Sequence, residues 1–67
     1  MRRFIFRAHD GEIEEEGRKL LAALDVEDVD VIRDETVAEA WLDDLEARRT
    51  IHGLEEIRGY LERLIKG

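Results

Sequence analysis

Residues 3–33, RFIFRAHDGEIEEEGRKLLAALDVEDVDVIR, decide the fold of this chain. In residues 3–8, Phe4 and Phe6 fall on one face of an extended chain and Ile5 on the other, which predicts a strand. Asp10 is a good N-cap, so we predict a helix over residues 11–24. Its apolar stripe recurs at helical spacing in Ile13, Gly17, Leu20, Leu21 and Leu24.

A second strand is predicted over residues 28–33, where the β-branched Val29, Val31 and Ile32 are bounded by aspartates. Strand, helix and strand then form a βαβ unit. Such units join parallel strands by a right-handed crossover, so we expect the two strands to be parallel, whether or not they are neighbours.

The second half of the chain predicts two more helices. One covers residues 35–48 with Asp34 as its cap, and its stripe consists of Val37, Ala38, Trp41, Leu42 and Leu45. Residues 50–52 offer only a short edge fragment. Gly53 breaks the pattern, and the last helix follows it and extends to about Lys66. We therefore expect one α/β domain over residues 1–67, β-α-β-α-(β)-α, with three helices and a small, mostly parallel sheet of two or three strands.

Composition restricts the function classes. The chain has 67 residues and no cysteine, so its folded state depends on one small core with a net stability of only a few kcal/mol. Self-association would add to this stability. Eighteen acidic and 11 basic residues give a net charge of −7, which repels phosphate backbones. We expect no nucleic-acid partner. A second copy of the chain and a basic protein both stay open as partners.

The expected location is the cytoplasm. No stretch approaches the roughly 20 apolar residues that span a bilayer, and residues 1–7 break too soon for a signal peptide. We therefore expect no membrane association.

Residues 3–33 also resemble the thioredoxin-like fold, in particular its glutaredoxin branch. The strand Phe4-Ile5-Phe6, the helix segment Glu15-Glu16-Gly17-Arg18-Lys19-Leu20-Leu21 and the strand Val29-Asp30-Val31-Ile32 carry the resemblance, and residues 53–57 look like the start of the family's last helix. The resemblance implies a minimal thioredoxin-like fold. Gly11 and Glu14 stand where the family has its two cysteines, so the redox motif is missing. The chain also has no proline for the family's cis-proline, and only residues 49–53 where the family has a β-hairpin.

No constellation of residues specifies catalysis, a cofactor or a metal. His9 and Asp10 could join Glu12, Glu15 and Glu16 in a cation site, but capping and the helix dipole account for these carboxylates. A phosphate site at Gly11 is opposed by the same glutamates, and no glycine-rich nucleotide motif is present. His52 has no serine or cysteine to activate. We expect no enzyme and no cofactor.

Two further features concern packing. Gly17 and Gly59 lie inside predicted helices, where a close approach of another segment would explain them. The arginines Arg2, Arg3 and Arg7 are expected to pair with carboxylates of the helix over residues 11–24.

The candidate interface residues are Trp41, Gly59 and Tyr60. The place of Trp41 in a helical stripe favours the core, whereas an exposed tryptophan would anchor an interface. We expect a non-enzymatic, small acidic interaction module that self-associates or binds a basic partner. The alternative is a degenerate thioredoxin- or glutaredoxin-like protein that binds a thiol or a redox partner without catalysis.

Overall fold

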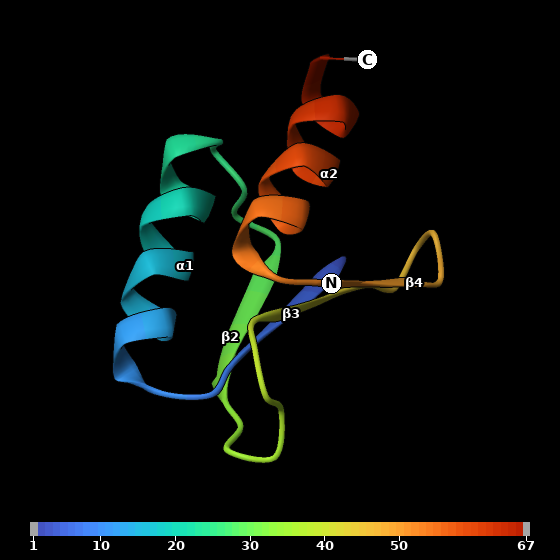
Figure 1. The fold of residues 1–67 in the computed structure, drawn as a ribbon. Coiled ribbons are helices and arrows are strands. Elements are labelled where there is room, and N and C mark those ends of the chain that lie inside the picture. Colours follow the sequence, from blue (N-terminus) through green and yellow to red (C-terminus); the bar gives the residue numbers. More distant parts are fainter. Residues whose placement is uncertain (1, 67) are drawn as a thin grey trace.

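The structure is a computed structural model that describes residues 2–66. In chain order the elements are β1 (Phe4–Ala8), α1 (Gly11–Ala23), β2 (Val29–Arg33), β3 (Trp41–Asp44), β4 (Arg49–His52) and α2 (Leu54–Lys66). The predicted strands at each end of the first crossover, the helix between them and the last helix are confirmed. Figure 1 shows their arrangement.

The strands form one four-stranded sheet in the order β2-β1-β3-β4. β1 and β2 are parallel, with Phe6 opposite Val31, as the βαβ unit predicts. β3 runs antiparallel to β1, and β4 runs antiparallel to β3. The sheet is therefore mixed, and the expectation of a mostly parallel sheet of two or three strands is wrong.

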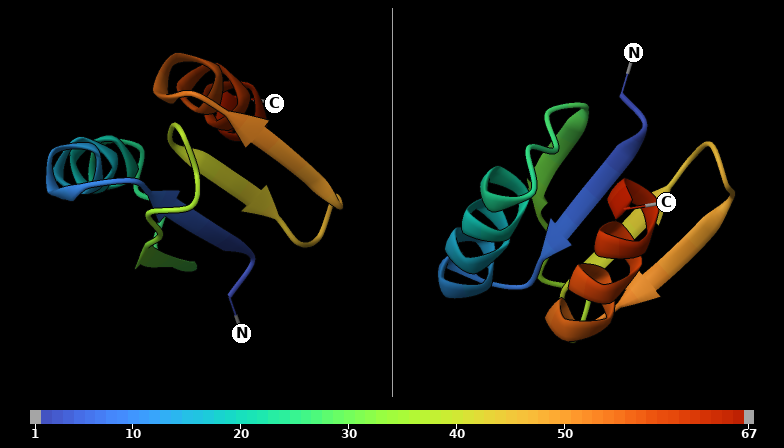
Figure 2. Two further views of the ribbon diagram at one scale, coloured as in Figure 1. Left: turned by 60° about the horizontal axis from the view of Figure 1, so that its bottom comes forward. Right: turned by 90° about the horizontal axis from the view of Figure 1, so that it is seen from above.

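Both helices cover the same face of this sheet (Figure 2, left). Alternation along β1 sends Phe4, Phe6 and Ala8 under them, while Leu42 of β3 lies against the same core. The remaining core residues come mainly from the helices and include Leu20, Leu21, Ile57 and Leu61. The opposite face carries no helix among the described residues.

The predicted helix over residues 35–48 does not form. Residues 34–40 are an irregular connection, and β3 and β4 make a hairpin in its place. Without β3, the second edge of β1 would be left with unpaired backbone groups, and residues 49–52 would have no strand to pair with. Strand pairing therefore decides the structure of residues 41–44, although their apolar residues are spaced as in a helix. The described residues hold two helices, not the three that we expected.

Gly17 is explained by packing. A Cβ added there would lie 2.3 Å from the ring of Phe6, which is fully buried. The helix can thus approach β1 only because residue 17 has no side chain. At Gly59, in contrast, an added Cβ would meet nothing within 4 Å among the described residues, so no close contact within the chain accounts for that glycine.

Candidate interaction surface

The face of the sheet that the helices leave open is the most distinctive surface of the chain. We call it the helix-free face. Cross-strand pairs fix its members, because Arg7 lies opposite both Ile32 and Trp41, and Trp41 lies opposite His52. It consists of Ile5, Arg7, Asp30, Ile32, Trp41, Asp43, Thr50 and His52.

An aromatic stack occupies one side of this face. The rings of Trp41 and His52 are stacked with their centroids 4.6 Å apart and their planes within 1° of parallel. β3 and β4 hold the two rings in place because the residues are a direct cross-strand pair. Trp41 is partly exposed and His52 is exposed, so this stacked pair, which we call the platform, is accessible to a partner.

Ion pairs border the platform. Arg7 lies between two carboxylates, 3.6 Å from Asp34 and 3.5 Å from Asp43. Thr50 donates a hydrogen bond of 2.7 Å to Asp43. Farther along the sheet, Arg2 pairs with Asp30 at 3.0 Å. On and beside the face, the three carboxylates of Asp30, Asp34 and Asp43 are thus paired with only two guanidinium groups, those of Arg2 and Arg7.

Asp34 is held in its ionised form. The side chain and the backbone N–H of Thr36 both donate to this carboxylate, and together with the charge of Arg7 they lower its pKa despite partial desolvation. The negative charge at the end of β2 therefore persists below the ordinary range of an aspartate.

The three candidate interface residues do not share one surface. Trp41 lies on the helix-free face, on β3 rather than on a helix. Tyr60 packs beneath α2 on the other side of the sheet, where its hydroxyl donates to Asp44. Gly59 is its neighbour on α2, with open space around it. Only Trp41 belongs to the candidate surface.

Asp44 is the principal residue that the sequence reasoning missed. It is 1% exposed at the end of β3, and Arg3 donates two hydrogen bonds of 3.0 Å to its carboxylate. The hydroxyl of Tyr60 and the backbone N–H groups of Glu46 and Ala47 also donate to it. Asp44 thereby connects the start of β1, the β3–β4 turn and α2. The repeated aspartate at residues 43–44 was the only sequence signal, and the predicted helix concealed it.

The electrostatics of this cluster follow from its contacts. Burial alone would raise the pKa of Asp44, but the hydrogen bonds from Arg3, Tyr60 and Ala47 outweigh burial and lower it to about 2. Burial and the hydrogen bond to Asp44 raise the pKa of Tyr60. Within residues 2–66, every buried side-chain nitrogen and oxygen has a hydrogen-bond partner, so the burial of the Asp44 carboxylate is compensated by its contacts.

Two of the residues considered for metal binding, His9 and Asp10, form hydrogen bonds within the chain. Nδ1 of His9 is hydrogen-bonded to the carbonyl of Val37 at 2.9 Å. Asp10 caps α1 through the N–H of Ile13, as expected. Within residues 2–66, no three His, Asp or Glu side chains are grouped so as to hold a metal ion.

The arginines near the N-terminus pair differently from our expectation. Arg2 contacts Asp30, Arg3 contacts Asp44 and Glu46, and Arg7 contacts Asp34 and Asp43. None of these partners is on α1. The expectation was wrong for Arg7 because alternation directs its side chain to the face opposite α1. Glu14 of α1 pairs instead with Arg18 and Arg33.

Comparison of the chain with family models, curated proteins and solved structures finds no match. In the described part of the chain, neither helix has the length and apolar character needed to cross a membrane. The fold and the surface define a small α/β domain with one helix-covered and one open sheet face.

Proposed function

We propose that this chain is a non-enzymatic interaction module whose helix-free face receives a basic, amphipathic segment of a partner protein. The observation that carries the proposal is the placement of both helices on one side, which leaves the Trp41–His52 stack open. Tryptophans in such positions are frequent anchors of protein interfaces, since a large rigid ring is removed from water at little cost in entropy.

The apolar part of the surface supports an amphipathic partner. Ile32 is 41% exposed, and Arg7, whose side chain is partly buried, lies between it and Trp41 in the sheet. A partner residue with a large apolar side chain would cover this strip and remove it from water, which is worth roughly 25 cal/mol per Å² of apolar area.

Charge supports a basic partner rather than an acidic one. The carboxylates of Asp30, Asp34 and Asp43 exceed the two arginines paired with them, and the whole chain carries −7. Cationic side chains would therefore be attracted over a distance and held at the border of the platform.

A titration with designed peptides tests the proposal. The probes are an amphipathic peptide of alternating arginine and leucine and the same peptide with glutamate for arginine. We expect the arginine peptide to shift the amide resonances of Ile5, Ile32 and Trp41 and to bind more weakly as salt is raised. Equal binding of the glutamate peptide, or shifts confined to the helices, would contradict the proposal.

A matched pair of variants distinguishes binding at the helix-free face from nonspecific binding to exposed apolar side chains. Trp41→Ala removes the platform and should weaken binding by about tenfold or more. Leu64→Ala is the control, because Leu64 is 42% exposed but lies on α2, on the other side of the sheet from the helix-free face. Circular dichroism checks that both variants are folded.

The hairpin of β3 and β4 favours a second candidate, a degenerate thioredoxin-like protein that binds a thiol. The sequence offered no such hairpin, and its presence before α2 supports the resemblance. Glu14, at the position of a family cysteine, pairs with Arg18 and Arg33 beside β2. Adding glutathione to the same NMR sample tests this candidate. Shifts at the start of α1 would favour it, and unchanged resonances would exclude glutathione binding.

A further inference from the structure

The outer edge of β2 is open in a specific register. The carbonyl of Asp28 accepts from the N–H of Phe4, and the N–H of Asp34 donates to the carbonyl of Ala8. Alternate residues bond in a parallel ladder, so Asp30 and Ile32 also direct their backbone groups toward β1. The N–H and C=O groups of Val29, Val31 and Arg33 consequently point away from the sheet. Among residues 2–66, no strand pairs with them.

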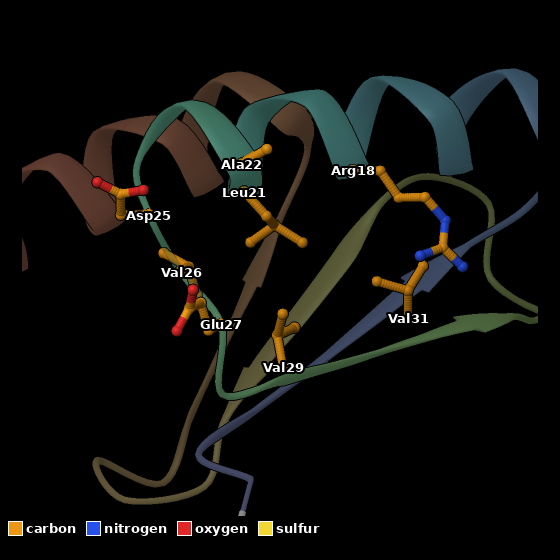
Figure 3. Close-up of a pocket in the computed structure, with 8 residues that line it drawn as sticks. All are labelled: Arg18, Leu21, Ala22, Asp25, Val26, Glu27, Val29 and Val31. Carbon is orange, nitrogen blue, oxygen red and sulfur yellow. The ribbon is translucent and has the colours of Figure 1, made fainter.

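A groove runs along this edge beneath α1. It measures about 380 Å³, and Leu21, Ala22, Val29 and Val31 form its apolar wall (Figure 3). Alternation places the side chains of an added strand in this groove at every second residue. The edge therefore offers both free backbone groups for hydrogen bonding and an apolar groove for side chains, which are the two requirements of recognition by strand addition.

The charges along the edge are polarised. Asp25 and Glu27 lie at the end of the groove near Val29, whereas Arg18 lies at the other end beside Val31 (Figure 3). Arg33 joins Arg18 at that end, since Glu14 contacts both, at 3.0 and 3.3 Å. One end of the edge thus carries two carboxylates, and the other carries two guanidinium groups that share the single carboxylate of Glu14, with valines between the two ends.

A polarised edge of this kind is complementary to itself. When two copies pair in antiparallel fashion around Val31, Val29 of one copy lies opposite Arg33 of the other, and Glu27 lies diagonal to that arginine. Glu27 of each copy then lies near Arg33 of its partner, while Asp28 lies opposite Asp34, whose carboxylate is already paired with Arg7 of its own copy. A twofold axis repeats each contact twice, as in isologous dimers.

We propose that the chain forms a symmetric homodimer by antiparallel pairing of its β2 edges, with Val31 at the twofold axis. The two four-stranded sheets then become one sheet of eight strands, twice the four of a single copy. This interface is separate from the aromatic stack on β3 and β4, so the stack stays open in the dimer. The interface also differs from the one expected at Gly59 and Tyr60.

Charge exchange across the axis tests the proposal. The mass is measured by sedimentation at several concentrations up to about 1 mM, the range of weak dimers. Glu27→Arg sets like charges against Arg33 of the other copy, and Arg33→Glu does so against Glu27. We expect each to weaken the dimer by about tenfold, and the double variant to recover most of the loss. Glu39→Arg makes the same charge change in the connection before β3 and should leave the mass unchanged.

A backbone variant completes the test. Val31→Pro removes an N–H that points outward and that the single copy does not use, so the domain should stay folded while the dimer is lost. Ile32→Pro removes a bond to β1 and should unfold the chain. A wild-type monomer throughout the range, a double variant no better than the single ones, or a folded Val31→Pro dimer would overturn the proposal.

Discussion

The carboxylate of Asp44 holds three parts of the chain together, and its ionisation makes that connection sensitive to acid. Its pKa is about 2 in the folded chain, below its ordinary 3.8. As the pH falls, the unfolded chain therefore binds the proton first. The stabilisation from Asp44 is complete above about pH 5 and is lost as the pH falls through the folded pKa, a loss of about 2 kcal/mol.

Asp44→Asn tests this role. The variant leaves Arg3 without its buried anionic partner, so we expect the free energy of unfolding at pH 7 to fall by about 3 kcal/mol. Tyr60→Phe removes one donor only and should cost about 1 kcal/mol. Urea unfolding at pH 7 and at pH 2.5 measures both. The difference in the free energy of unfolding between the wild type and Asp44→Asn should be smaller at pH 2.5 than at pH 7. An equal difference at both pH values would contradict the stabilising role of the Asp44 carboxylate.

Gly17 and Gly59 give a matched pair of predictions with opposite signs. Gly59→Ala adds a methyl group that meets no other segment of residues 2–66 within 4 Å and should stabilise α2 by about 1 kcal/mol. Gly17→Ala pushes a methyl group into the buried ring of Phe6 and should cost about 1–3 kcal/mol. Thermal unfolding compares the two variants. A stabilising Gly17→Ala would contradict the close packing of α1 on β1.

At the scale of elements, the parts that could be predicted are those governed by local patterns. The alternation of Phe4 and Phe6 and the cap at Asp10 were sufficient for β1 and α1, and their order implied the parallel pair with β2. The last helix followed from its stripe after Gly53. In each of these elements, the local preference and the tertiary packing agree.

The hairpin could not be predicted because its pattern is ambiguous. Val37, Trp41 and Leu45 fit helical spacing, while the buried side chains of β3 are Leu42 and Asp44. Because one of these two is a carboxylate, no apolar alternation marked the strand. The burial of Asp44 depends on Arg3 and Tyr60, which are distant in sequence. The helix-free face was missed for the same reason, since it exists only when residues 41–44 form a strand.

At the scale of the whole molecule, the two proposals use different parts of one sheet. The homodimer forms along the edge of β2, and the basic segment binds the helix-free face. Pairing along β2 would extend the sheet, and the helix-free faces of both copies would then lie on one continuous surface. The open face of each copy would present its own Trp41–His52 stack. A dimer could thus engage two basic segments at once, and linked segments would gain from their effective concentration.

The fold itself rests on whether residues 41–44 are a strand with its tryptophan on the helix-free face, and one NMR measurement tests this most directly. In a nuclear Overhauser spectrum of the wild-type chain, we expect cross-strand contacts from Trp41 to His52 and to Arg7. Contacts between each residue and the third or fourth residue after it across residues 35–48 would instead indicate a helix. That result would contradict the sheet order, the helix-free face and the function proposed for it.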